Sequence, residues 1–212
     1  AKSGSEEPMS TYADLFLTNY AYGAAAYGKG AVFPAQLGYV VGQKNLDEGL
    51  LRYFNEWKFK HPTPWDFMLV MEKQSGLQLG WYLNYMVNTT NTIDYSIKRV
   101  DGRSAGTEIT LERIGDFPMP IDLDIFLRDG THKQINIPLR MMRGSKPAED
   151  ENIDYSVASD WPWTNPTYRL SLDIPIDKIE SIEIDASQRL ADIDRSNNLV
   201  NLEPDSEIII AN

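Results

Sequence analysis

The chain has 212 residues, 42% of them hydrophobic and 11% aromatic, which is enough to build one large core or two small ones. Its 20 Lys and Arg residues stand against 31 Asp and Glu residues, which gives a net charge of −11 at pH 7. This acidic balance repels a phosphate backbone, and no apolar run approaches the ~20 residues of a membrane helix, so the sequence predicts neither a nucleic-acid partner nor a membrane span.

The first part of the chain has helical periodicity. Residues 1–11 lack an initiator Met and an apolar signal segment, and we expect them to be disordered or to derive from a cut end. From residue 12 to residue 92, apolar side chains recur at helical spacing. A first helix is predicted over residues 24–41, with Gly42 ending it. Its opening turns are expected to be irregular because they contain two glycines and a proline (Gly28, Gly30, Pro34).

Three further helices are predicted in this part of the chain. Asn45 is expected to cap the second helix, whose apolar stripe is Leu50, Leu51, Phe54 and Trp57. Thr63 is expected to cap the third helix, with Pro64 at its first position and Asp66 three residues after the cap, and Ser75-Gly76 ends it. A fourth helix is predicted over residues 77–87. Four helices with short joints favour stacked antiparallel pairs.

After residue 92 the hydrophobic period changes from helical spacing to two. Alternation predicts strands over residues 95–100, 108–113, 121–127, 134–139, 168–172 and 179–184. Turn residues such as Asp101-Gly102 and Asp129-Gly130 separate them, and residues 144–166 are expected to form a long loop. The sequence therefore predicts a multi-domain protein of helical hairpins over residues 12–92, followed by an antiparallel immunoglobulin-like β-sandwich over residues 93–212.

Few residues in the chain could hold a metal. The absence of Cys excludes thiolate ligands and thiol nucleophiles. The only two histidines, His61 and His132, belong to no H-E-x-x-H motif and have no evident convergent partners. We interpret both as exposed or hydrogen-bonded loop residues, so no zinc is expected in this chain.

A series of short motifs in the helical part has a specific order. Tyr27-Gly28-Lys29-Gly30 is followed by Phe59-Lys60-His61-Pro62-Thr63, by Asp66-Phe67, by Met71-Glu72-Lys73-Gln74-Ser75-Gly76 and by Trp81. Over residues 20–94 this succession resembles the catalytic domain of the aminopeptidase N and leukotriene hydrolase family of zinc peptidases, the gluzincins. That family shows Y-x-K-G, F-x-H-P-T, D-F and M-E-x-x-S-G in the same order and spacing.

The resemblance implies a metallopeptidase that removes N-terminal residues from peptides. In the family, two His and one Glu hold a zinc that activates water, a second Glu is the general base, and the Y-x-K-G tyrosine stabilises the oxyanion. Tyr27 occupies the position of that tyrosine, and a phenol hydroxyl can donate such a hydrogen bond. Tyr22 and Lys29 are candidate substrate-binding residues, although packing or an ion pair explains them equally well.

The part of the family's pattern that carries the zinc is absent here. The H-E-x-x-H helix, the third zinc ligand and the strand that reads the substrate amine normally precede Y-x-K-G. Their absence favours a C-terminal fragment, which we expect to be inactive alone and to self-associate through residues 12–90, where an apolar helical face would be exposed. The alternative is a catalytically inactive interaction module built from the same hairpins and sandwich.

Two weaker interpretations concern the second half of the chain. Oxygen-bearing side chains stand at EF-hand-like spacing in Asp192, Asp194, Ser196 and Glu203, which makes them a calcium candidate. Asn197 replaces the expected Gly, so a hydrogen-bonded Asx turn is favoured. A second interpretation is a carbohydrate-binding platform of Trp161 and Trp163, but a loop-anchoring role fits their turn-rich surroundings better.

Overall fold

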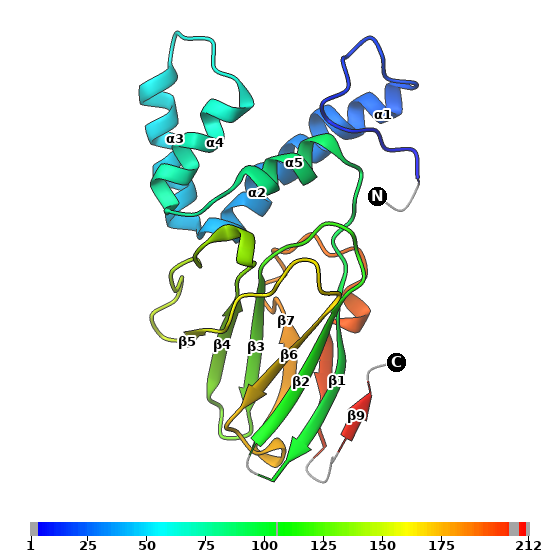
Figure 1. The fold of residues 1–212 in the computed structure, drawn as a ribbon, viewed down its shortest axis with the longest axis vertical. Coiled ribbons are helices and arrows are strands. Elements are labelled where there is room, and N and C mark those ends of the chain that lie inside the picture. Colours follow the sequence, from blue (N-terminus) through cyan, green and yellow to red (C-terminus); the bar gives the residue numbers. More distant parts are fainter. Residues whose placement is uncertain (1–3, 105, 204–207, 211–212) are drawn as a thin grey trace. The chain divides into compact units, whose positions relative to one another are not determined.

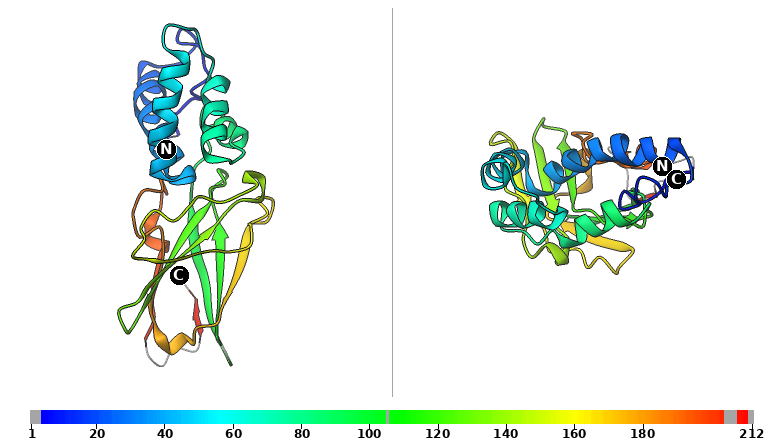
Figure 2. Two further views of the ribbon diagram at one scale, coloured as in Figure 1. Left: turned by 90° about the vertical axis from the view of Figure 1, so that its left-hand side faces the viewer. Right: turned by 90° about the horizontal axis from the view of Figure 1, so that it is seen from above.

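A computed structural model describes residues 4–104, 106–203 and 208–210 of the chain. The chain forms two compact units (Figures 1 and 2). The helical unit consists of the residues up to Thr92 together with Met141–Glu149, and the β unit consists of Ile93–Arg140 and the residues from Asp150 on. Among the residues described, no helix is long and apolar enough to cross a membrane.

The helical unit begins with one continuous run of helix. This run consists of α1 (Asn19–Gly23), the π-helix η1 (Ala24–Lys29) and α2 (Gly30–Val41). Gly42 ends it with a φ of 85°, in the region that favours glycine. Three helices follow, α3 (Gln43–Trp57), α4 (Pro64–Ser75) and α5 (Gly80–Asn88). Along the sequence, the 3₁₀ turn η2 (Arg140–Met142) lies between two strands of the β unit.

The core of the helical unit lies where these helices meet. The Tyr82 hydroxyl, buried with its ring, donates to the Phe33 carbonyl at 2.6 Å and so satisfies its polar group inside this core. Gly49 lets α3 approach α4 closely, because a Cβ there would stand 2.5 Å from the Met71 sulfur. The large buried apolar side chains of the helices are Leu37, Tyr39, Val40, Val41, Leu46, Met68, Val70, Met71, Tyr82, Leu83 and Met86.

The ends of the helices differ in part from the prediction. The first helix starts at Asn19, earlier than predicted, because the Thr18 hydroxyl accepts from the Ala21 N–H and caps it. The second starts at Gln43, so Asn45 lies inside it and donates to the Val41 carbonyl. The third helix is confirmed at both ends, with Thr63 as cap and Gly76 in the left-handed conformation. The fourth starts at Gly80 instead of residue 77.

The β unit contains two sheets (Figure 1). The four-stranded sheet has the order β6-β2-β1-β9, and the five-stranded sheet has the order β5-β4-β3-β7-β8. Six of these strands confirm the alternation that predicted them, within a few residues at their ends: β1 (Tyr95–Arg103), β2 (Gly106–Arg113), β3 (Ile121–Leu127), β4 (His132–Ile137), β6 (Thr167–Leu172) and β7 (Ile179–Ile184).

The remaining strands were not predicted. They are β5 (Asp154–Val157), β8 (Leu199–Asn201) and β9 (Ile208–Ile210). β5 pairs with β4 in parallel, so the five-stranded sheet is mixed and not purely antiparallel as predicted. β5 lies within the stretch predicted as a loop over residues 144–166.

Alternating apolar residues of both sheets form the core of the β unit. Tyr95 is buried in it, and its hydroxyl donates to the Met119 carbonyl at 3.0 Å and accepts from the Met119 N–H at 2.8 Å. Burial raises the pKa of Tyr95, so the phenol stays neutral there. The Tyr95 ring also makes an edge-to-face contact with Trp161, with ring centroids 5.6 Å apart.

Candidate functional site

Tyr27 lies in the π-helical turn between α1 and α2. A π-helix is wider than an α-helix, and such turns occur mostly as single insertions in α-helices, frequently at functional sites. Here the turn spans Ala24–Lys29, and Tyr27 is 73% exposed. Gly28 is open on its surface as well, since a Cβ there would meet no atom within 4 Å. The turn therefore exposes the Tyr27 phenol to solvent, and it is held on both sides by α1 and α2.

Two aromatic side chains accompany Tyr27. The Tyr22 ring stands edge-on to the Tyr27 ring, with centroids 6.4 Å apart and an interplanar angle of 89°. Phe16 also makes an edge-to-face contact with Tyr22, with centroids 5.5 Å apart. Edge-to-face pairs at these distances are favourable arrangements for aromatic rings. The structure therefore brings Tyr22 and Tyr27 together; Phe16 was not foreseen, because no motif includes it.

Lys29 has different surroundings from Tyr27. Residues two apart in a helix do not face the same side. The Lys29 ammonium donates to the Thr89 carbonyl at 2.6 Å, at the C-cap of α5, where a cation is favoured by the helix dipole. Burial lowers the pKa of Lys29, and the negative charge of Glu6 opposes this shift. Lys29 thus joins the π-turn to the end of α5, and the structure does not place its ammonium beside the Tyr27 ring.

The residues described do not fit a zinc ion. Among them, no three or more His, Cys, Asp or Glu side chains gather in a way that could hold a metal. His61 is exposed just before α4. His132 lies at the start of β4, with its Nε2 atom 2.8 Å from the buried Asp124 carboxylate and its ring stacked on Phe126.

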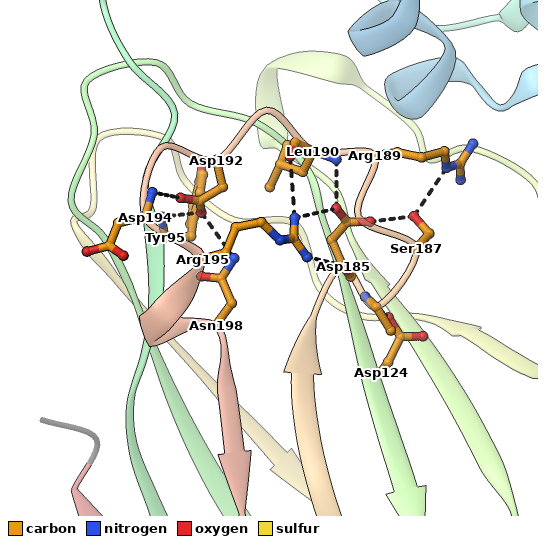
Figure 3. A network of polar contacts seen from close by, with 11 residues as sticks. Tyr95, Asp124, Asp185, Ser187, Arg189, Leu190, Asp192, Asp194, Arg195 and Asn198 are labelled. Carbon is orange, nitrogen blue, oxygen red and sulfur yellow. Dashed lines mark hydrogen bonds and ion pairs between the residues drawn. The ribbon is translucent and has the colours of Figure 1, made fainter. Parts of the chain in front are cut away.

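A second polar cluster lies in the β unit at the end of β7 (Figure 3). Asp185 is fully buried and adopts a φ of 53°, a left-handed conformation that Asp tolerates. Its carboxylate accepts from the Leu190 N–H at 2.6 Å and from the Arg195 guanidinium at 3.3 Å. Arg195 also donates to the Asp185 carbonyl at 2.9 Å. These hydrogen bonds hold the 185–198 loop against the sheet, and they satisfy the Asp185 carboxylate with an N–H donor and a cation.

The calcium candidate lies beside this cluster and has the geometry of Asx turns. Asp192 accepts from the Asp194 N–H at 2.8 Å and from the Tyr95 N–H at 3.0 Å (Figure 3). Asp194 accepts from the N–H and the hydroxyl of Ser196 and caps the short turn η4 (Arg195–Asn197). These carboxylates thus bind N–H donors, and Glu203 is exposed. Calcium binding stays a prediction that calorimetry can test.

The two tryptophans of the 150–166 stretch do not form one platform. Trp161 is 1% exposed, and its indole N–H donates to the Asn165 carbonyl at 2.9 Å. Trp163 is 43% exposed. Because Trp161 is in the core, only Trp163 could touch a ligand, and the loop-anchoring interpretation holds for Trp161.

Comparison with known proteins supports the fold alone. No model of a known protein family matches the chain, and no curated protein matches it in sequence. The chain is similar in fold to Legionella pneumophila aminopeptidase A in its crystal structure with aspartic acid, with a TM-score of 0.52 and 15% sequence identity. The likeness covers 82% of this chain and 18% of that protein, so the chain corresponds to less than a fifth of its length.

Proposed function

We propose that this chain is the C-terminal part of a zinc metallo-aminopeptidase and that Tyr27 stabilises the oxyanion when an N-terminal residue is removed from a peptide. The observation that carries the proposal is the exposed Tyr27 hydroxyl on a π-turn within the Y-x-K-G motif. The series of four motifs and the likeness in fold to an aminopeptidase support it. The zinc and its general base belong to residues outside the described ones, which do not fit the metal.

The chemistry assigned to Tyr27 is a single hydrogen bond. Attack of water on a peptide carbonyl turns the carbonyl oxygen into an oxyanion, and a fixed donor lowers the energy of that state more than that of the substrate. The Tyr22 ring restricts the Tyr27 ring from one side, and we propose that Tyr22 also lines the cleft. Lys29 acts as a positioning residue, because its bond to Thr89 fixes the turn that carries Tyr27. A contact between Lys29 and the substrate stays a prediction that binding measurements can test.

The β unit is proposed to be the immunoglobulin-like sandwich domain that follows the catalytic domain in this family. Two sheets of four and five strands over a shared apolar core support this assignment. On this proposal the domains comprise residues 12–92 and 93–212, after a short leading segment, except that Met141–Glu149 packs with the helical unit. The β unit then serves as a scaffold and takes no part in the hydrolysis.

The proposal is tested on the gene product that contains this chain. We expect it to hydrolyse aminoacyl p-nitroanilides in a chelator-sensitive manner. Tyr27→Phe is expected to lower kcat by about 10²–10³, with KM and zinc content little changed, because it removes one oxyanion donor. The matched control is Tyr12→Phe, which removes the hydroxyl of another exposed tyrosine and leaves kcat unchanged.

Two outcomes would contradict the assignment. A gene product without chelator-sensitive aminopeptidase activity would exclude the peptidase role. An active gene product whose kcat is insensitive to Tyr27→Phe would exclude the oxyanion role. The first outcome would favour the second candidate function, a catalytically inactive interaction module, which is supported by the exposed apolar side chains on the helical unit.

A further inference from the structure

Helix α3 carries two apolar faces, and only one of them is used within the helical unit. The inner face contacts α2 and α4 through Leu46, through Gly49 and through Tyr53, whose ring packs on Phe67 with centroids 5.0 Å apart. The outer face is open. Leu51 is 63% exposed, Phe54 is 62% exposed and Leu50 is 40% exposed. Large apolar side chains that are exposed next to one another are typical of an interaction surface.

The charges at the two ends of the outer face have opposite signs. At about 100° per residue, Asp47, Leu51, Phe54 and Lys58 fall within about 60° of one another around the helix axis. Asp47 is exposed near the start of α3, and Lys58 is exposed at its C-cap, with its ammonium 5.8 Å from the centroid of the Phe54 ring. The outer face therefore runs from an anion, across an apolar centre, to a cation.

We propose that this outer face of α3 binds the same face of a second copy of the chain, with the two helices antiparallel about a two-fold axis that crosses the outer face at the height of residues 52 and 53. In this arrangement Leu51 stands level with Phe54 of the second copy, and Asp47 stands level with Lys58 of the second copy. The two-fold axis repeats each contact, as an isologous interface requires. A parallel pairing would instead set Asp47 against Asp47 and Lys58 against Lys58, which is unfavourable.

The size of the face predicts a weak and reversible dimer. A helix of 15 residues is about 22 Å long, and one helix pair buries an area at the low end for specific complexes. The dimer should therefore form only as the protein concentration rises. The charged ends determine the orientation of the two helices, while the apolar centre supplies most of the affinity.

The experiment is sedimentation velocity over a wide range of protein concentrations, with a charge swap. Asp47→Lys and Lys58→Asp each create two like-charge contacts per dimer, and each is expected to weaken dimerisation by about tenfold. The double variant D47K/K58D restores opposite charges and is expected to recover the original affinity to within about threefold. Leu51→Glu, which is exposed and compatible with a helix, is expected to abolish the dimer.

The matched control is Leu17→Glu, which adds the same charge at another exposed leucine of the helical unit and should leave dimerisation unchanged. Circular dichroism confirms that each variant is folded. A chain that stays monomeric at the highest concentration overturns the proposal. A dimer that survives Leu51→Glu uses another surface and also overturns it, and failure of the double variant to recover affinity overturns the antiparallel arrangement.

Discussion

Tyr27 and Lys29 stand two residues apart in one motif, and the structure gives them different surroundings. The motif predicts a role for Tyr27, whose side chain is exposed, and that role stays a prediction. Sequence could not supply the partner of Lys29, because Thr89 is sixty residues away and the contact depends on how α5 packs. In the same way, the contact between His132 and Asp124 depends on the register of β3 and β4.

Lys29 gives a prediction at the scale of a single residue. Lys29→Met keeps most of the apolar stem but removes the ammonium that donates to Thr89. We expect the free energy of unfolding of the helical unit to fall by about 1 kcal/mol, at the low end for charged hydrogen bonds because the side chain is half-exposed. The measurement is urea denaturation followed by circular dichroism at neutral pH.

The pH dependence of the same variant has a defined sign. Burial lowers the pKa of Lys29 in the folded state, so between that pKa and the ordinary value of about 10.4 the unfolded state binds more protons. In that alkaline window the free energy of unfolding of the wild-type chain should rise with pH, relative to that of Lys29→Met. An unchanged stability together with weaker peptide binding would instead return Lys29 to the substrate-contact interpretation.

At the scale of the elements, residues that cap or terminate helices located the ends of α4 better than hydrophobic periodicity did. Thr63, Pro64 and Gly76 placed both ends of α4 correctly, because caps act through local hydrogen bonds and dihedral angles. The sequence predicted only an irregular helix around Gly28, not a π-turn. A periodicity of 3.6 residues per turn describes an α-helix and does not detect the wider π-helix. Thr18, a good capping residue, was the unused signal for the true start of the first helix.

The cap of α4 gives a prediction at this scale. The Asp66 carboxylate accepts from the Thr63 N–H and from the Thr63 hydroxyl, both at 2.7 Å. The Thr63 hydroxyl, followed by the Thr63 N–H, lowers the pKa of Asp66. A lowered carboxyl pKa stabilises the folded state above the ordinary value of about 3.9, and this contribution is lost as the pH falls through the folded-state pKa.

Asp66→Asn should therefore destabilise α4 at pH 7, and the difference from wild type should disappear in strong acid. Chemical denaturation at pH 7 and again below pH 3, followed by helical circular dichroism, measures both limits. Asp14→Asn is the matched control, because this exposed carboxylate of the helical unit lies before the first helix and caps none. Equal losses in the two variants, or a loss in Asp66→Asn that persists in acid, would contradict the capping role.

At the scale of the whole molecule, the change of period at residue 92 separated helical from β structure. The six predicted strands are long enough for their alternation to be visible, whereas β5 and β8 have four and three residues and give no such pattern. Met141–Glu149 joins the helical unit although it follows four strands, because contacts and not sequence order define the units. Each unit has a core of its own, so a local substitution should act on its own unit.

The ion pair of Asp185 and Arg195 tests this independence. Arg195→Ala leaves a fully buried carboxylate with the Leu190 N–H and the Ser187 hydroxyl but without its cation. Removing one partner of a buried pair is strongly destabilising, and with these donors retained we expect a loss of about 3 kcal/mol. Amide hydrogen exchange should show lower protection in β3, β7 and β8, with protection in α2–α5 unchanged.

The matched control is Arg140→Ala, which breaks an exposed pair with Asp160 in the same unit and should lower the free energy of unfolding by less than about 1 kcal/mol. Equal effects of the two substitutions would mean that Arg195 does not compensate the buried charge, and a loss of protection in both units would mean that they unfold as one.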